Sequence, residues 1–269
     1  MSSQQTETKS ILLLHRHLTP TPAHQPLLQA IQKVLNESYR KSHSARADIF
    51  GTSFTRLPDP AHFANSIGGY GFTIALCRAP NKDEHLDIMA TGSARRFKHP
   101  EAETYEQWMT ALSAGTADSA DLDGGEVATG DIDDTESVST LKYEVTAFAV
   151  SPDAQARGLG ARVLRELEWL VKRIPSRGNL RQWLGDTMPT VAVEGALLGF
   201  DLDKILSQHN DIAQQAGSAP QLVLFGIQEL GTEAYYQRRG FHTVWTGAVP
   251  AGTWYSLNEC TAVYMEKTM

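Results

Sequence analysis

An apolar strand, two glycines and a helical pattern follow one another in the middle of the chain. Tyr143–Val150 is apolar enough for a buried strand, Ser-Pro-Asp then marks a turn, and apolar spacing predicts a helix over about Leu159–Arg173. Gly158 and Gly160 therefore stand where that helix begins. Glycines at a helix N-terminus let a ligand approach the backbone, and the free N–H groups and helix dipole favour an anion.

Three simpler or competing interpretations of this stretch can be weighed from its spacing. The glycines can merely shape a turn. A dinucleotide-binding fingerprint needs another glycine three residues after Gly160, where the sequence has Val163. A phosphate-binding P-loop needs Gly-Lys-Ser/Thr, which is absent.

Two motifs resemble those of the GCN5-related N-acetyltransferase (GNAT) superfamily. Gln155–Gly160 (Gln-Ala-Arg-Gly-Leu-Gly) matches the Arg/Gln-x-x-Gly-x-Gly/Ala signature that holds the pyrophosphate of acetyl-CoA in that family. Tyr235–Phe241 (Tyr-Tyr-Gln-Arg-Arg-Gly-Phe) matches its Tyr-x-x-x-Gly-Phe element. The resemblance is strong over Leu141–Arg173 and Gln221–Glu266, and the order of elements extends it to Ile11–Lys98.

The resemblance implies an α+β fold, with a mixed, mostly antiparallel central sheet of about seven strands flanked by helices. It also implies a single domain over residues 10–269. Periodicity and turn residues predict helices over 26–41, 60–67, 159–173 and 232–239, with strands over 10–19, 70–78, 86–98, 143–150, 221–230, 241–245 and 261–266. We expect two insertions: residues 174–219 are apolar and predicted helical, and residues 113–140 are predicted disordered.

The predicted disordered segment also explains the net charge of −7. Ser113–Leu141 holds eight acidic and no basic residues, which leaves 24 basic against 23 acidic residues elsewhere. The chain therefore has no basic patch that favours nucleic acid. Its apolar runs are too short to span a membrane, and its two cysteines and scattered histidines predict no metal site. We expect an intracellular protein, cytoplasmic or nuclear.

The resemblance implies that acetyl-CoA lies along the signature strand and the turn. Its pantetheine arm is expected on Phe148, Ala149 and Val150. Its phosphates are expected on Gln155, Ala156, Arg157, Gly158, Leu159, Gly160 and Ala161. Arg162 is a further cation within reach of the phosphates, or an ordinary solvated helix residue.

Acetyl transfer to an amine needs a group that takes a proton from the ammonium and one that stabilises the leaving thiolate. The resemblance assigns the second role to Tyr236, four residues before Gly240; the adjacent Tyr235 is expected to pack elsewhere. For the base, Glu144 stands where the histone-acetyltransferase branch of the family carries its glutamate, and Glu229 ends the next strand. A water relay without a single base also stays open.

The sequence says less about the amine acceptor than about acetyl-CoA. By the resemblance, its groove lies between residues 40–57 and residues 246–260, both of which contain aromatic and acidic side chains. Such side chains suit a small primary amine, and residues 174–219 can close the pocket or form a homodimer face. The alternatives are a protein or peptide acceptor, and an acyl-CoA-binding module without catalysis. Strand alternation predicts that Glu144, Phe148 and Val150 share a face unless a bulge intervenes.

Overall fold

The computed structural model describes residues 8–51, 55–78, 86–97, 107, 110, 142–173, 189–193, 196–208, 219–252, 254 and 256–269, with the side chains of 192–198 left aside. The acidic segment 113–140 lies outside the described residues, as do residues 174–188 and 209–218 of the second insertion.

Nine strands of the described residues form one sheet in the order β5-β6-β1-β2-β3-β4-β7-β9-β8. Neighbouring strands of this sheet pair antiparallel, except that β4 pairs parallel with β7. The mixed α+β class predicted from the sequence is confirmed, but with nine strands instead of about seven. The strands are β1 (Thr8–Leu14), β2 (Phe72–Arg78), β3 (Ile88–Arg96), β4 (Lys142–Val150), β5 (Thr190–Val193), β6 (Ala196–Asp201), β7 (Gln221–Ile227), β8 (His242–Val249) and β9 (Cys260–Thr268).

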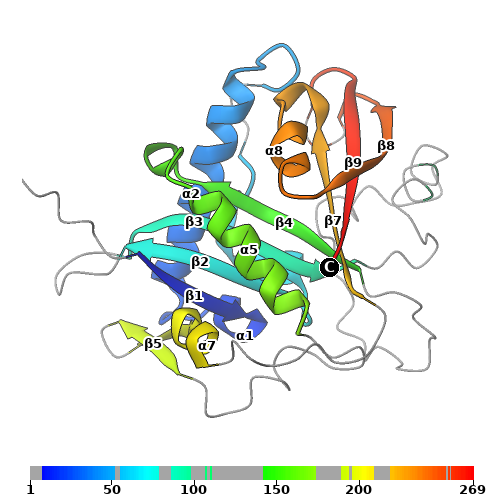
Figure 1. Ribbon diagram of the computed structural model, residues 1–269. Coiled ribbons are helices and arrows are strands. Elements are labelled where there is room, and N and C mark those ends of the chain that lie inside the picture. The colour runs from blue at the N-terminus through cyan, green and yellow to red at the C-terminus, as the bar shows by residue number, and fades with distance from the viewer. Residues whose placement is uncertain are drawn as a thin grey trace, which may run out of the picture.

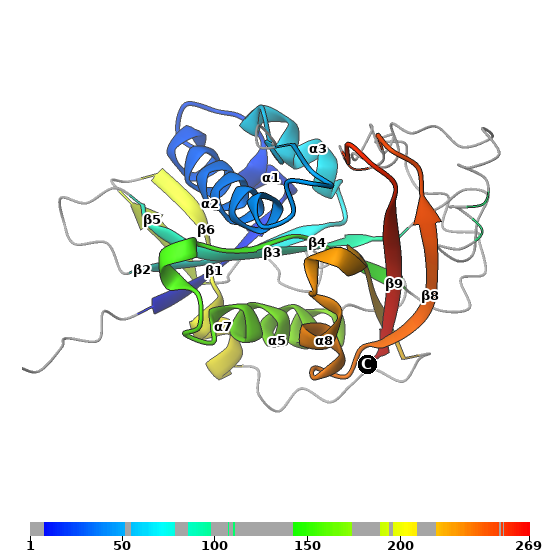
Figure 2. The same ribbon diagram turned by 90° about the horizontal axis from the view of Figure 1, so that it is seen from above.

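Helices cover both faces of the sheet (Figure 2). One face carries α1 (His15–Leu18), α2 (Gln25–Ser44), the 3₁₀ turn η1 (Pro60–His62) and α3 (Phe63–Ile67). The other carries α5 (Leu159–Val171), α7 (Leu202–Gln208) and α8 (Glu233–Gln237). Two further 3₁₀ turns, η3 (Pro152–Ala154) and η4 (Gln228–Leu230), follow β4 and β7.

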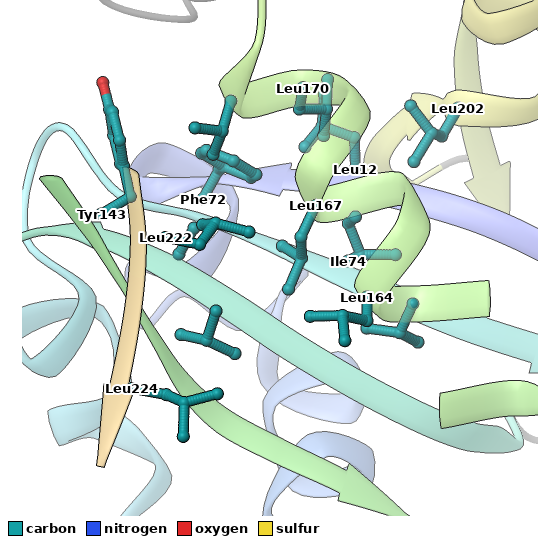
Figure 3. Packing of buried hydrophobic residues seen from close by; sticks show 14 of the residues in the cluster. Leu12, Phe72, Ile74, Tyr143, Leu164, Leu167, Leu170, Leu202, Leu222 and Leu224 are labelled. Atoms are coloured by element: carbon teal, nitrogen blue, oxygen red, sulfur yellow. The ribbon is translucent and has the colours of Figure 1, made fainter. Parts of the chain in front are cut away.

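The larger core lies between the sheet and α5 (Figure 3). Leu164, Leu167 and Leu170 of α5 are almost fully buried against Leu12, Ile74 and their neighbours on the strands. Burying one leucine side chain contributes roughly 2 kcal/mol. With Val163 and Val171, these leucines form a stripe with spacings of three and four, which fixes the helix, and its N-terminal glycines, over the end of β4.

The described part of residues 174–219 differs from the helical segment that the sequence predicts. It forms the hairpin β5–β6 and only one short helix, α7. Ile11 and Leu12 of β1 pair with Asp201 and Phe200, so the hairpin extends the sheet beyond its expected edge. A Cβ on Gly199 would lie 2.7 Å from the carbonyl oxygen of Leu12, so this glycine permits the close approach of the two strands.

The sheet opens between β4 and β7. These two strands pair only where Lys142–Glu144 meets Gln221–Val223. Beyond that point they separate, and α8 follows β7 on one side of the gap while the turn after β4 lies on the other (Figure 1). The unpaired backbone edges of β4 and β7 face this gap, which positions the candidate site.

Candidate functional site

The turn after β4 leaves the start of α5 open. Gly158 is the N-cap of α5 with φ of 78°, a left-handed conformation that favours glycine, and no side chain caps the helix. Ala156 also has a positive φ, of 62°. A Cβ placed on Gly158 would meet no atom within 4 Å. The helix therefore presents its first N–H groups, at the positive end of its dipole, without a competing side chain.

Gly160 has a different role from Gly158. A Cβ on Gly160 would lie 2.7 Å from the Tyr235 hydroxyl and 3.3 Å from a methyl group of Val150. The glycine thus allows α5 to begin in direct contact with α8 and the end of β4. The Tyr235 hydroxyl is buried here and has no hydrogen-bond partner among the described residues, and burial raises its pKa.

Two cationic side chains lie at the turn between β4 and α5: Arg157, which the motif predicted, and Lys41, which it did not. Arg157 is exposed and donates a hydrogen bond to the Asp153 carbonyl at 2.9 Å. Lys41 of α2 donates to the Gln155 side chain at 2.9 Å. No local pattern pointed to Lys41, because it lies 114 residues from Gln155 and continues an ordinary helical pattern.

The suggestion that Arg162 reaches the phosphates is not supported by its contacts. Its guanidinium is held by Glu166 at 2.8 Å and by Asp203 of α7 at 2.7 Å. It also donates to the Thr8 carbonyl and the Ser10 hydroxyl. These bonds join α5 to β1 and to the helix of the second insertion, so Arg162 is a structural cation.

A cavity of about 570 Å³ borders the turn on the α2 side. Its lining mixes apolar side chains, such as Ala30 and Val34 of α2, with charged ones, such as Lys33 of the same helix. Arg157 and Asp153 of the turn form part of its edge. The turn therefore has open space beside it as well as in front of its helix.

A bulge in β4 changes which side chains share a face. Ala147 has φ of 46°, and the register with β3 shifts between Thr91 and Ser93. Before the bulge, Tyr143 and Val145 belong to the core beneath α5; after it, Ala147 and Ala149 belong to the core beneath α2. The predicted shared face of Glu144, Phe148 and Val150 is therefore wrong. Phe148 and Val150 pack on the α5 side, whereas Glu144 points to the side of α2 and α3.

Glu144 is buried, with 3% of its surface exposed. Its Oε2 accepts a hydrogen bond from Nε of Arg95 at 2.8 Å. Its Oε1 is also buried and has no partner among the described residues. The charge of Glu144 contributes to the raised pKa of Tyr264 on β9, after burial and the hydrogen bond with Glu266. The carboxylate thus lies where β4, β7 and β9 are still close together, at the closed end of the gap.

Glu229 takes part in hydrogen bonds that join the end of β7 to β9 and to the loop after α2. Its two carboxylate oxygens accept the backbone N–H of Thr261, at 2.9 and 3.2 Å, at the start of β9. Its carbonyl oxygen accepts a hydrogen bond from Arg46, in the loop after α2. Both oxygens of the side chain are therefore already in use, unlike those of Glu144.

Tyr236 lies among aromatic side chains at the open part of the gap. Its ring packs against Phe148 of β4, with centroids 6.1 Å apart, and against Phe241, at 5.8 Å. Burial raises the pKa of Tyr236 well above its usual value, and the neighbouring phenols of Tyr39 and Tyr235 add to this effect. Tyr39 belongs to α2, on the opposite face of the sheet, so the two tyrosines interact across the gap. The sequence did not identify Tyr39 as part of the site.

Two loops meet at the other end of the site. A bridge joins Phe50, after α2, to Ser256, between β8 and β9. The Ile49 carbonyl accepts from the N–H of Leu257, and the Asp48 carbonyl accepts from Asn258, each at 2.6 Å. The two stretches predicted to flank the acceptor are thus in contact with each other.

Within the described residues, no group of three or more His, Cys, Asp or Glu side chains is arranged to hold a metal ion. No helix in that part of the chain combines the length and apolar character needed to cross a membrane.

Comparison with known proteins gives distant structural likenesses only. No protein-family model matches the chain, and no curated protein matches it. Acetyl-CoA-bound NAA60 of Arabidopsis thaliana is 9% identical, with a TM-score of 0.43 over 98% of this chain and 99% of that one. The ribosomal-protein-S18-alanine N-acetyltransferase of Escherichia coli is 11% identical, with a TM-score of 0.41 over 96% and 93%. FeeM, an N-acyl amino acid synthase from uncultured soil microbes, is 10% identical, with a TM-score of 0.43 over 97% and 91%. At this distance, the function of the chain has to be judged from its own residues.

Proposed function

We propose that this chain is a member of the GNAT superfamily and an acetyl-CoA-dependent N-acetyltransferase. One observation carries the proposal: the gap between β4 and β7 has an uncapped helix N-terminus at one side and the partly buried phenol of Tyr236, packed against Phe148, at the other. A strand edge with free backbone groups suits an amide-containing arm, and the helix start suits a pyrophosphate. Acetyl-CoA contains both.

The residues proposed to hold acetyl-CoA are those expected from the motif. The edge of β4 over Phe148, Ala149 and Val150 is unpaired on the β7 side and can hydrogen bond the pantetheine amides. Gln155 to Gly158 form the turn, and Leu159 to Ala161 the first turn of α5, where phosphate oxygens can accept backbone N–H groups. Lys41, held against Gln155, adds a positive charge.

The proposed chemistry is direct transfer in a ternary complex, for which acetyl-CoA supplies the thioester. Glu144 accepts a proton from the bound ammonium, which frees the nitrogen lone pair to form the new bond to the acetyl carbon. As the carbon–sulfur bond breaks, its electron pair goes to sulfur, and Tyr236 donates a hydrogen bond there. The nitrogen gives up its second proton as the amide forms, and this proton ends on the leaving sulfur, through Tyr236 or through water. A phenol is protonated at neutral pH even at its ordinary pKa of about 10. Because burial raises the pKa of Tyr236 further, a hydrogen bond to sulfur is favoured over full transfer of its proton.

We propose a small amine as the acceptor. An internal lysine of a protein needs a groove open at both ends, so that the chain can enter and leave. The bridge between Phe50 and Ser256, together with the hydrogen bonds beside it, closes one end. Trp254 stacks on Phe225 with centroids 4.8 Å apart and so adds an apolar wall at that end. A short amine with an apolar body suits such a pocket.

The test is thiol release from acetyl-CoA by the full chain with a panel of small amines, basic peptides and peptide N-termini. We expect release that depends on an added small amine and is metal-independent. Release with internal-lysine peptides alone would contradict the acceptor class. Tight acetyl-CoA binding without release under any condition would instead identify a binding module.

A further inference from the structure

Arg95 stands directly opposite Glu144 in the pairing of β3 with β4. Its Nε donates to Glu144 Oε2 at 2.8 Å, and its Nη1 donates to the carbonyl oxygen of Ser66 in α3 at 3.1 Å. The side chains of Arg95 and Glu144 are 17% and 4% exposed. The guanidinium is therefore fixed from two sides, by the carboxylate and by the helix above it.

The other carboxylate oxygen is left with no partner. Oε1 of Glu144 is buried and accepts no hydrogen bond from the described residues. A buried charged oxygen without a donor is costly, so this position suits a group that supplies an N–H or O–H. The asymmetry follows from Arg95, which occupies Oε2 only.

We propose that Arg95 is a positioning residue for acetyl transfer: it holds Oε2 of Glu144 so that Oε1 alone faces the acceptor nitrogen. This role rests on the proposed function, in which Glu144 is the base. The proton passes from the ammonium to Oε1, while Arg95 keeps its own protons throughout, because a guanidinium is not deprotonated in proteins. Its planar fork joins a carboxylate and a carbonyl at once, which a lysine cannot reproduce in the same geometry.

The experiment combines two readouts on the full chain. The free energies of unfolding in urea of Arg95→Met, Glu144→Gln and the double variant form a double-mutant cycle. This cycle tests the interaction between the two side chains without any need for activity. The same variants are then assayed for kcat, amine KM and acetyl-CoA Kd. We expect Arg95→Met to lower kcat about tenfold or more while the Kd for acetyl-CoA changes less than about twofold. In the Glu144→Gln background, the same change should alter kcat less than about twofold.

Three controls separate positioning from general damage. Arg95→Lys keeps the charge and should restore part of kcat. Arg96→Met removes the next arginine and should leave kcat unchanged. The charge of Arg96 acts to lower the pKa of Tyr143, which lies on the opposite face of the sheet from Glu144. If Arg95→Met does not fold, Arg95→Gln keeps an amide donor for the Ser66 carbonyl and should show the same loss of kcat.

The outcomes distinguish this inference from the proposed function. A folded Arg95→Met or Arg95→Gln variant with wild-type kcat would overturn the positioning role, and so would an equal loss of kcat with and without Glu144. If the two substitutions change the free energy of unfolding additively, Arg95 and Glu144 do not interact, and the inference fails at its first step. A wild-type chain that releases no thiol with any amine would instead refute the proposed function, and the role of Arg95 with it.

Discussion

Two adjacent tyrosines of α8 have different surroundings, although they follow each other in the sequence. Tyr236 packs between Phe148 and Phe241, and burial raises its pKa. We predict that Tyr236→Phe lowers kcat by about 10²-fold, near the lower end for proton-transfer catalysis, because a thiol is an easy leaving group. The acetyl-CoA Kd and the melting temperature should change little. Steady-state kinetics measure kcat, titration calorimetry measures the Kd, and thermal unfolding measures the melting temperature.

Tyr235→Phe is the matched control. The Tyr235 hydroxyl faces Gly160 at the start of α5 and has no partner among the described residues. Removing it should leave kcat near the wild-type value, and any effect should be on acetyl-CoA affinity, because the hydroxyl lies against the turn. If Tyr235→Phe lowers kcat and Tyr236→Phe does not, the two roles are reversed.

The two glutamates also differ in what their oxygens already bind. One buried oxygen of Glu144 has no partner among the described residues, whereas both oxygens of Glu229 accept the N–H of Thr261. We predict that Glu144→Gln lowers kcat at neutral pH by about 10²-fold. The deficit should shrink as the pH rises, because more of the amine is then deprotonated in solution.

Glu229→Gln provides the comparison for this prediction. Its amide can still accept from Thr261 through one oxygen, so kcat should change by less than about threefold, with at most a small loss of stability of roughly 1 kcal/mol. The reverse pattern in the pH–rate profiles would make Glu229 the base. Equal profiles in both variants and in the wild-type chain would favour a water relay.

At the scale of elements, the turn between β4 and α5 can be tested by one substitution. Gly158 has φ of 78°, and a Cβ there would point into open space, where we propose the pyrophosphate binds. We predict that Gly158→Val raises the acetyl-CoA Kd at least tenfold, equivalent to about 1.4 kcal/mol. Isothermal titration measures the Kd, and circular dichroism checks the fold.

Gly231 offers a control for backbone strain alone. It also has a positive φ, of 68°, and no atom within 4 Å of an added Cβ, but it lies after η4, away from the turn. Gly231→Val should therefore cost a similar strain without changing acetyl-CoA affinity. An unchanged Kd in a folded Gly158→Val variant would contradict binding at this turn.

The sequence predicted a helix or strand correctly where a single local pattern, such as helical apolar spacing, determined it. The apolar spacing of α2 and α5 follows from a helix with one buried face, and both were located within a few residues. The bulge in β4 was not predictable as a particular residue, since alanine carries no preference for the positive φ found at Ala147. The β5–β6 hairpin was missed because a short apolar run fits a buried helix as well as a strand until its partner, β1, is known.

At the scale of the whole molecule, the predicted site residues came from motifs, whereas their partners came from distant parts of the chain. Arg95 lies 49 residues from Glu144, and Lys41 lies 114 residues from Gln155. Such contacts depend on sheet order and on which helices cover each face, neither of which a local pattern determines. Arg162 illustrates the reverse error: its position beside the turn suggested phosphate, but Asp203 from the second insertion binds it.

Two buried histidines make the stability of the whole chain depend on pH. Burial, with a contribution from Arg16, lowers the pKa of His17 to about 4. Burial and the charge of Arg56 lower that of His43 to about 4. Above the ordinary histidine pKa of 6.5, both side chains are neutral whether the chain is folded or unfolded. As the pH falls from about 6.5 towards 4, the unfolded chain takes up protons that the folded chain refuses, so stability is lost.

We predict that the free energy of unfolding falls between about pH 6.5 and pH 4.5, at up to roughly 1.4 kcal/mol per pH unit for each histidine. Glu166 opposes this, because burial raises its pKa and it takes up a proton more readily in the folded chain. Urea denaturation across this range measures the slope. His17→Asn should reduce it, whereas His62→Asn, at a side chain that is 75% exposed, should not. If the slope is the same in all three proteins, His17 is protonated as readily in the folded chain as in the unfolded one, and its burial does not control the response to acid.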